Sequence, residues 1–183
     1  MGLFEKLRIW SLFGKMTNSR LGTRFQSTFR KLVEKGMKPI AAGESDEPPA
    51  FTPLRKPLSQ CRVSLITTTG VHLREQEPFD TAAALGDSSY RAVPSDADPA
   101  RLCISHTHYP LDRAQADINV ILPLDRLREL AGEGVIGSVG SCHYCYGFDL
   151  HVKELVDPAV GSAHEVARAL VEDGVDVVLL TPG

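Results

Sequence analysis

The sequence lacks any long apolar run, which argues against a membrane-spanning helix. None of its 183 residues belongs to a stretch near the roughly 20 apolar residues that a helix needs to cross a bilayer. The apolar stretch at 9–13 is too short and too interrupted for a cleavable secretory signal. With 43% hydrophobic and 23% charged residues, the composition is that of one soluble domain with a buried core.

Cysteine is also scarce, with only four residues of this type. In a chain without a predicted signal, Cys61, Cys103, Cys142 and Cys145 favour free thiols over structural disulfides. Cys61 and Cys103 stand singly in predicted strands, so we expect them in the core. These features predict a cytoplasmic protein.

A strong positive charge is missing overall, and the net charge of −3 argues against a general nucleic-acid binder. The charge is nevertheless uneven. Residues 1–38 carry nine Lys or Arg against two Glu, a net of +7, which leaves −10 for the remainder. Apolar stripes at 3–13 and 20–34 predict a basic helical arm over 1–40 that docks on the body or on a partner. Contact of residues 1–38 with an anionic membrane surface is the less favoured alternative.

A proline-rich linker at 41–60 separates this arm from an α/β domain predicted over 61–183. Within the domain, apolar runs alternate with helical patterns, which is typical of a mostly parallel sheet with flanking helices, Rossmann- or flavodoxin-like. We predict strands at 61–70, 90–94, 101–107, 135–147 and 175–180, and helices at 123–134 and 161–174.

Three of these elements carry more detailed predictions. The segment 90–94 is short and should be an edge strand. Ser162 with Glu165 three residues later has the spacing of a capping box, so Ser162 should be the N-cap of the last helix. The run 175–180 is apolar throughout, as in a parallel strand covered on both faces.

Polar and thiol groups gather after four predicted strands. In open α/β sheets, ligands bind beyond the carboxyl ends of the strands, so these groups should share one rim. The segments are TTTGVH (67–72), SHTHY (105–109), SCHYCYG (141–147) and TPG (181–183).

His106 and His108 invite a metal-site interpretation, because two histidines separated by one residue can ligate one Zn²⁺. Pro110 stands where the His-x-His-x-Asp-His pattern of metallo-β-lactamase-like hydrolases has an aspartate. Hydrogen bonding in a substrate pocket and ordinary strand-end histidines are therefore favoured over metal ligation. A small metal-dependent hydrolase centred on His106 and His108 stays as an alternative function.

Two further motifs leave alternatives open. The C-x-x-C of Cys142 and Cys145 has the spacing of a redox pair, but the residues after it do not begin a clean helix. Incidental thiols, or half of a metal site, are the alternatives. Asp117, with Asn119 close by, is either a turn cap or a buried acid in the pocket.

Three stretches together resemble a known family, the selenoprotein B family of the glycine, sarcosine, betaine and D-proline reductases. The resemblance is strongest to the D-proline reductase branch with its small selenocysteine subunit. It covers most of 61–183 and does not include 1–60. The matching stretches are LITTTGVHLREQEPFD (65–80), SHTHY…D…DIN…PLDRLRELAGEGVIGSV (105–139) and EDGVDVVLLTPG (172–183).

The resemblance implies an oxidoreductase that reductively cleaves the C–N bond of an amino acid or related amine. A selenocysteine is expected immediately after Gly183, so the chain as given should be inactive on its own. The selenolate would attack the α-carbon and a cysteine would resolve the selenium adduct. The implied partners are a subunit that carries a pyruvoyl group and a thioredoxin-like electron donor, with no cofactor in this chain.

The resemblance also implies site residues. His106 and Asp117 would orient or protonate groups near the selenium, and structural support of the rim loops is the alternative for each. The residues implied for the substrate pocket are Gly70, His72, Ser105, Tyr109, Asn119, Thr181 and Gly183. The family member with the best match lacks Cys at the positions of Cys142 and Cys145, so the resemblance adds no support for a role of the C-x-x-C.

A non-catalytic binding or redox subunit with the same fold is the main alternative function.

One physical expectation holds whether the protein is a reductase subunit or a non-catalytic one. The segment that would cover the strand at 175–180 is not in this sequence, so that strand should present an exposed apolar edge, prone to pairing or aggregation.

Overall fold

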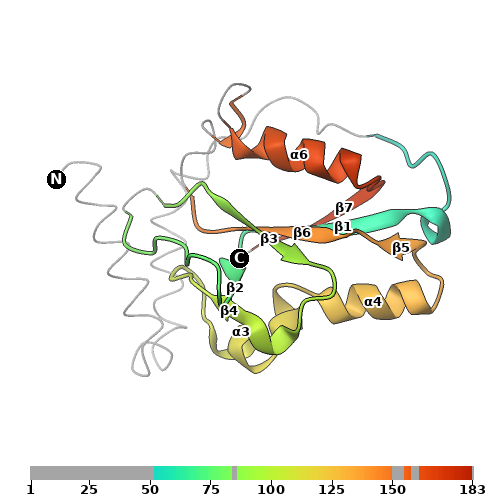
Figure 1. Cartoon of the computed structure of the whole chain (residues 1–183). Helices are drawn as coiled ribbons and strands as arrows, with labels where there is room; N and C mark the ends of the chain where they lie inside the picture. Colours follow the sequence, from blue (N-terminus) through green and yellow to red (C-terminus); the bar gives the residue numbers. More distant parts are fainter. Residues whose placement is uncertain (1–51, 84–85, 150–154, 158–160, 183) are drawn as a thin grey trace, which may run out of the picture.

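The computed structural model describes residues 52–83, 86–149, 155–157 and 161–182 (Figure 1). The predicted basic arm, most of the predicted linker and Gly183 lie outside these residues. The described part of the linker contains one short 3-10 turn, η1, and no α-helix or strand. No helix in the described part of the chain is long and apolar enough to cross a membrane.

Strands and helices follow one another from residue 62 onward, with four strands before the first α-helix. The elements in chain order are η1 (Leu58–Gln60), β1 (Arg62–Thr67), β2 (Val71–Leu73), β3 (Tyr90–Pro94), η2 (Pro99–Arg101), β4 (Leu102–Ile104), α3 (Asp112–Ala116), η3 (Ile118–Val120), α4 (Leu124–Gly132), β5 (Ser138–Val139), β6 (Cys142–Tyr146), α6 (Ser162–Glu172) and β7 (Val177–Thr181).

The main sheet is built around β1. On one side β1 pairs in parallel with β7, and on the other with β5 near its start and β6 near its end. β3 pairs antiparallel with β6 and forms the far edge. Four of the five strands are parallel, which confirms the predicted α/β fold with a mostly parallel sheet. The edge strand predicted at 90–94 is present with the same bounds.

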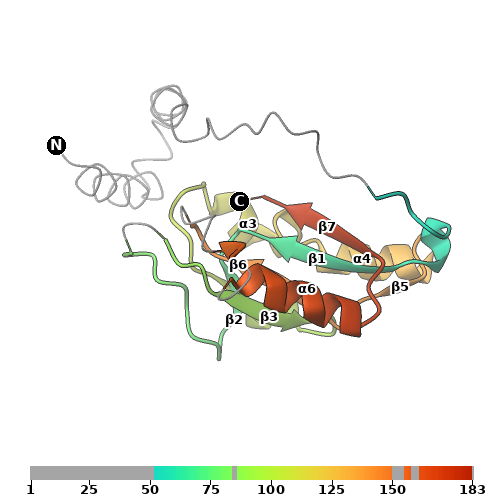
Figure 2. The same ribbon diagram turned by 90° about the horizontal axis from the view of Figure 1, so that it is seen from above.

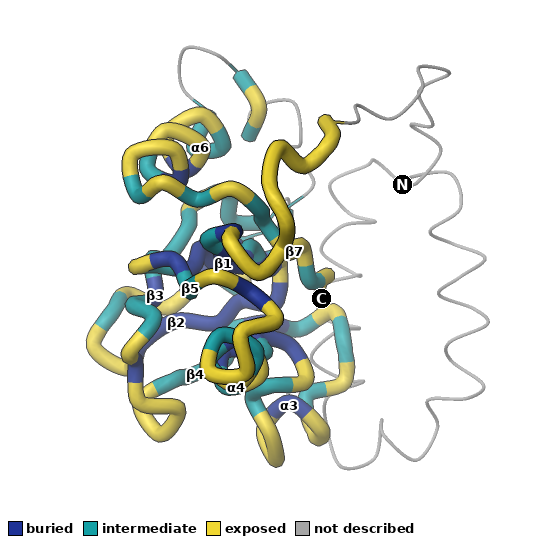
Figure 3. Tube along the Cα trace, turned by 90° about the vertical axis from the view of Figure 1, so that its right-hand side faces the viewer, coloured by how far each residue is buried: buried dark blue, intermediate teal, exposed yellow. Residues whose placement is uncertain are grey.

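Helices cover the two faces of this sheet and define two apolar layers. Figure 1 shows α6 on one face, with α4, α3 and the β2–β4 ribbon on the other, and Figure 2 shows α6 lying over the sheet. Tyr144 and Tyr146 of β6 pack with Val166 and Leu170 of α6. The opposite layer holds most of the buried apolar residues, including Leu65 of β1 and Leu124 and Leu127 of α4. Figure 3 shows the buried residues gathered in the strands between the helices.

The strand predicted at 101–107 is present only as β4, and its place differs from the prediction. β4 does not join the main sheet but pairs antiparallel with β2 in a separate two-stranded ribbon. The reason is Gly70, which lies between β1 and β2, directly before β2, and adopts a φ of 69° that turns the chain into β2. The ribbon then lies against the carboxyl ends of the main strands.

The predicted N-cap of α6 is also wrong. The N-cap is Gly161, while the Ser162 hydroxyl donates to the carbonyl oxygen of Ser88 at 3.1 Å. The position favours glycine, because a Cβ at Gly161 would lie 2.3 Å from the carbonyl oxygen of Leu155. The Ser162 hydroxyl therefore bonds to the loop before β3 and does not cap the helix.

β7 forms the other edge of the described sheet, since it pairs with β1 and with no second described strand. Leu179 and Leu180 are 45% and 69% exposed. The prediction of an exposed apolar edge is confirmed. The prediction that this strand is covered on both faces is wrong for the described residues.

An ionic network ties the amino-terminal ends of the parallel strands together. Asp173, after α6, accepts from Arg62 Nη2 at 2.8 Å and from the Ser141 backbone N–H and hydroxyl, each at 2.6 Å. Burial raises the pKa of Asp173, but the bonds from Arg62 and Ser141 outweigh it and lower the pKa to about 2. Asp176 accepts from the Arg62 backbone N–H and pairs with Lys56 at 2.8 Å. The network fixes the start of β7 beside β1.

Replacing Asp173 with Asn should lower the free energy of unfolding by about 2–3 kcal/mol, because a charged acceptor of three hydrogen bonds is lost. Urea unfolding should show a lower midpoint with an unchanged m-value. Glu129→Gln is the matched control, since Glu129 pairs with Arg126 on an exposed helix face and its loss should change stability by less than about 0.5 kcal/mol. Equal effects of the two substitutions would contradict the role given to Asp173.

Candidate functional site

The carboxyl ends of β1, β6 and β7 meet at one rim, and Gly70 connects this rim to the β2–β4 ribbon. The Gly70 N–H donates to the carbonyl oxygen of Tyr146 at 2.8 Å, and the Ser105 N–H donates to the Gly70 carbonyl oxygen at 2.8 Å. A Cβ at Gly70 would lie 2.3 Å from the Ser105 carbonyl oxygen. Only glycine fits both the φ of Gly70 and this close approach.

Threonine hydroxyls hold the ends of β1 and β7 together. Thr67 and Thr181 both donate to the Ile121 carbonyl oxygen, at 3.2 and 3.0 Å. The hydroxyls of Thr67 and Thr69 lie 2.7 Å apart, and both residues are fully buried. Thr181, predicted as a pocket residue, therefore lies at the rim and fixes the direction in which the chain leaves β7.

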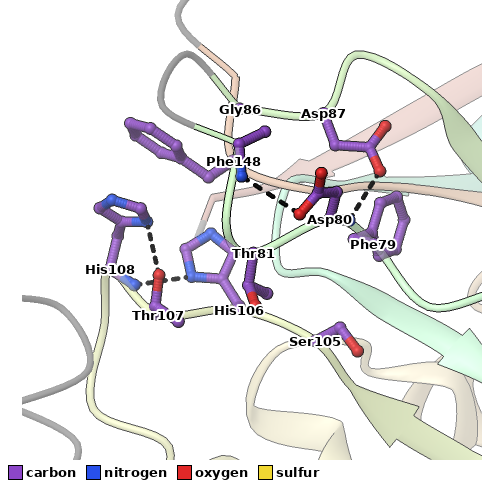
Figure 4. Close-up of a pocket in the computed structure, with 11 residues that line it drawn as sticks. Phe79, Asp80, Thr81, Gly86, Asp87, Ser105, His106, Thr107, His108 and Phe148 are labelled. Carbon is purple, nitrogen blue, oxygen red and sulfur yellow. Dashed lines mark hydrogen bonds between the residues drawn. The ribbon is translucent and has the colours of Figure 1, made fainter. Parts of the chain in front are cut away.

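An aromatic and histidine cluster follows β4 at the same rim. The Tyr109 hydroxyl donates to the Thr69 carbonyl oxygen at 2.8 Å, and its ring centroid lies 4.5 Å from that of His106. The His108 ring stacks on Phe148 with centroids 3.7 Å apart (Figure 4). The structure therefore brings together the predicted residues Gly70, Ser105, His106 and Tyr109.

His106 is uncharged near neutral pH. Burial, and secondarily the nearby His108, lower the pKa of His106 to about 4. The His108 N–H donates to His106 Nδ1 at 3.1 Å, so the remaining ring proton sits on Nε2. Burial also raises the pKa of Tyr109 well above its ordinary value. The cluster can therefore offer neutral N–H and O–H donors, and it holds no positive charge of its own.

A small hollow opens beside His106. It leaves about 10 Å³ for the centre of a water-sized molecule, which is room for about one water and far below the volume of a ligand pocket. Two aromatic rings, Phe79 and Phe148, lie on its walls with Ser105, and the carboxylates of Asp80 and Asp87 lie on its outer side (Figure 4). We call this hollow the His106 cavity.

Asp117 and Asn119 do not line the His106 cavity. They line a different groove, next to α3 and α4, and they act there as caps. Asp117 accepts from the Asn119 N–H at 2.9 Å, and these Asn119 bonds lower the pKa of Asp117. Asn119 Oδ1 accepts from the Asp125 N–H at 3.0 Å and so caps α4, whose own N-cap residue Pro123 makes no side-chain cap. This geometry supports the turn-capping alternative for Asp117.

His72 and Ser105 form a hydrogen-bonded pair at the cavity wall. His72 Nε2 lies 2.9 Å from Ser105 Oγ, and His72 Nδ1 lies 2.8 Å from the Leu73 carbonyl oxygen. His72 is only 4% exposed. Both residues were predicted as pocket residues. Of the two, Ser105 alone lines the cavity, and its hydroxyl oxygen points away from the cavity towards His72 (Figure 4).

Cys142 and Cys145 lie within strand β6, so the single Gly-rich strand predicted at 135–147 is present as two strands, β5 and β6. Cys145 belongs to the apolar layer of α4 and Cys142 packs in the layer of α6, so the two thiols point to opposite faces of the sheet. Residues three apart on a strand are separated by about 10 Å, whereas a disulfide needs Cα atoms within about 7 Å. Burial raises the pKa of both thiols. The structure disfavours a redox pair and supports incidental thiols.

Among the described residues, no three His, Cys, Asp or Glu side chains form a group that could hold a metal ion. His106 and His108 are neighbours, with ring centroids 5.6 Å apart, but this part of the chain supplies no third ligand to them. The hydrolase alternative therefore gains no support from the geometry.

Sequence patterns missed one buried histidine, His143. Its Nδ1 accepts from the Leu65 N–H at 3.0 Å, and no described residue bonds to its Nε2. Burial, with a contribution from Arg128, lowers the pKa of His143 to about 4. The strand predicted at 135–147 includes this position, and the alternation of side chains along it could have indicated that His143 is buried.

Comparisons with known proteins confirm the predicted family. A family model described as glycine/sarcosine/betaine reductase selenoprotein B matches residues 41–183, which includes the predicted linker that the resemblance left out. The chain is 35% identical over 155 residues to the D-proline reductase subunit gamma of Acetoanaerobium sticklandii, across 82% of this chain and 60% of that protein. No solved structure matched.

A second relative is the sarcosine reductase complex component B subunit beta of Peptoclostridium acidaminophilum. It is 29% identical over 132 residues, across 70% of this chain and 29% of that protein. The chain thus spans less than two thirds of either relative.

The protein should lose stability as the pH falls from about 6.5 towards 4. His106 and His143 have folded-state pKa values of about 4, below the ordinary 6.5, so unfolding takes up protons in this window. Each such histidine contributes a loss of up to about 1.4 kcal/mol per pH unit. His143→Asn, whose Oδ1 can replace Nδ1 as acceptor for Leu65, should make the slope of unfolding free energy against pH shallower.

His164→Asn, at an exposed position of α6, is the matched control for this substitution. Urea unfolding at several pH values measures the slope. An unaltered slope in His143→Asn would mean that His143 does not titrate below its ordinary pKa in the folded state.

Mild oxidation of the folded protein should form no disulfide between Cys142 and Cys145. A thiol reagent should modify the partly exposed Cys103 and Cys142 before the buried Cys61 and Cys145, as measured by mass spectrometry. The same chain in guanidinium chloride, where all thiols are accessible, is the control. Rapid oxidation to a Cys142–Cys145 disulfide in the folded state would restore the redox-pair interpretation.

Proposed function

Because the chain belongs to the glycine/sarcosine/betaine reductase selenoprotein B family, we propose that it is part of a reductase subunit that cleaves the C–N bond of an amino acid or related amine. The rim described above is the proposed reaction site. A small zwitterionic or cationic substrate would be held there between this chain and a partner subunit.

The observation that carries this proposal is the convergence of β7 with the His106–Tyr109 cluster. Thr181, the last residue of β7, shares the Ile121 carbonyl with Thr67, and Thr67 contacts Thr69, which in turn binds Tyr109. A residue placed soon after β7 would therefore leave the sheet at the rim that His106 occupies. This supports a selenocysteine immediately after Gly183 as the proposed nucleophile.

The proposed chemistry balances as a two-electron reduction. The selenolate attacks the α-carbon, the C–N bond breaks, and the leaving nitrogen takes the bonding pair and a proton. A thiol then attacks selenium, and the released carbon takes a second proton. A dithiol donor of the thioredoxin type supplies the two electrons and becomes a disulfide. We propose a pyruvoyl group on the partner subunit as the group that holds the substrate amine.

In this scheme His106 is a neutral hydrogen-bond donor through Nε2. An imidazolium would be scarce near neutral pH, because the pKa of His106 is about 4. Tyr109 and the stacked pair of His108 and Phe148 pack around His106, and the His108 N–H fixes its tautomer. Asp117 is not assigned a part in the reaction, since it lies in the other groove.

The decisive test begins with the DNA that follows the codon for Gly183. An in-frame UGA with a continuing reading frame and a selenocysteine insertion element is expected, and the complete protein should contain one selenium. With its partner subunit and a dithiol, the complete protein should release a reduced amine product. His106→Gln should lower kcat by about 10²-fold or more, while His164→Gln should not.

Another stop codon with no homologous frame after it would overturn the proposal. Selenium incorporation without thiol-dependent turnover would favour the non-catalytic alternative.

A further inference from the structure

The face of β7 that points towards the α6 layer is uncovered among the described residues. Val178 packs against the residues under α6, and Leu180, two positions further on, points to the same face of the sheet. Leu180 is nevertheless 69% exposed. Figure 2 shows α6 lying over β6 and β3, with β7 to one side of it. Parallel strands are usually covered on both faces, so this part of β7 is a place where another element fits.

The flank of α6 nearest to β7 is apolar as well. Glu165 bonds to Tyr90 of β3, which marks the flank of α6 that points away from β7. Ala163, Ala167 and Val171, spaced four residues apart, lie along the opposite flank. Val171 is 75% exposed. We call the surface formed by these three residues, Val178 and Leu180 the β7–α6 face.

The chain enters the described structure beside the start of β7. Lys56 pairs with Asp176 at 2.8 Å, and Asp176 directly precedes β7. Residues 35–51 connect this part of the chain to the helix predicted at 20–34, and seventeen extended residues span up to about 56 Å. β7 has five residues and is about 16 Å long. The segment 20–34 can therefore reach any part of the β7–α6 face.

The segment 20–34 combines an apolar stripe with a basic remainder. The stripe consists of Leu21, Phe25, Phe29, Leu32 and Val33. The segment also carries four Arg or Lys and one Glu, whereas residues 39–183 have a net charge of −10. A helix of fifteen residues is about 22 Å long, which is enough to cover β7. The stripe therefore suits the apolar β7–α6 face, and the charge of the segment suits the acidic α/β domain.

We propose that residues 20–34 form an amphipathic helix that docks on the β7–α6 face of the same chain. The helix lies beside α6, with its apolar stripe on Leu180 and Val171 and its Arg and Lys side chains towards solvent. It extends the α6 layer over β7 and so holds the strand that leads to the rim. A helix is favoured over an added strand, because the segment has helical periodicity and the uncovered groups are side chains on one face of the sheet.

The docked helix can be tested on the 183-residue chain by photo-crosslinking from position 180. With Leu180 replaced by benzoylphenylalanine, illumination should link this position to residues 20–34, as read by mass spectrometry of tryptic peptides. A mixture of nitrogen-15-labelled and unlabelled chains shows whether the links form within one chain, because such links never join a labelled to an unlabelled peptide. The same replacement at Val120, which is 59% exposed, is the matched control and should give no link to 20–34.

Leu180→Asp should release the helix and raise the rate of trypsin cleavage at Arg24 and Arg30 at least about tenfold, whereas Val120→Asp should not. Links from position 180 that join two chains only, that miss 20–34, or that form equally from position 120 would overturn the proposal. Unchanged cleavage in Leu180→Asp would overturn it as well. If Leu180→Asp does not fold, the crosslinks decide the question. Neither measurement needs selenocysteine or turnover, so the outcome is independent of the reductase assay.

Discussion

The backbone crossing at Gly70 positions most of the site. Gly70 follows the central strand β1, bonds through its N–H to β6 and through its carbonyl to Ser105, and leaves no room for a Cβ. Two strands of the main sheet and the separate β2–β4 ribbon are thereby held at a single peptide unit. Because side chains at the rim all follow from this crossing, a substituted Gly70 would displace His72, Ser105 and His106 together.

The parallel strands are held together by charged hydrogen bonds at their amino-terminal ends and by uncharged ones at their carboxyl ends. At the amino-terminal end, Arg62 and Asp173 hold the start of β7 beside β1 through charged hydrogen bonds. At the carboxyl end the same two strands are joined by threonine hydroxyls that share the Ile121 carbonyl. Uncharged bonds in a buried setting fix geometry without adding a field at the rim.

Much of the fold could be predicted from the sequence, because the local pattern of apolar and polar residues matches the observed burial in many elements. The run 90–94 became β3 with the predicted bounds, and the apolar run at 175–180 became an exposed edge strand. The prediction failed where a tertiary contact overrides the local pattern. The apolar residues at 102–104 fit a main-sheet strand equally well, and only the turn at Gly70 sends β4 to another ribbon. Likewise, Ser162 bonds to a distant carbonyl rather than to its own helix.

The site was predicted less completely than the fold, and for a related reason. Clustering of His106, Tyr109, Ser105 and Gly70 followed from placing strand ends at one rim. Asp117 and Asn119 are of residue types that can act in catalysis. In this structure, however, Asp117 fixes a turn and Asn119 caps α4. The C-x-x-C spacing is that of a redox pair. A strand cannot form such a pair, because successive side chains point to opposite faces and the two thiols lie in different apolar layers.

His106 and Tyr109, whose rings are in contact at the rim, are both uncharged near neutral pH. Burial keeps the imidazole of His106 neutral and the phenol of Tyr109 protonated, so these two groups offer hydrogen bonds without charge. Charge lies at the outer side of the cavity, on Asp80 and Asp87 and on Arg91, whose guanidinium lies 4.5 Å from the centre of the Phe79 ring. A polar group that meets His106 or Tyr109 is therefore oriented by uncharged hydrogen bonds, in contrast to the charged bonds at the other end of the strands.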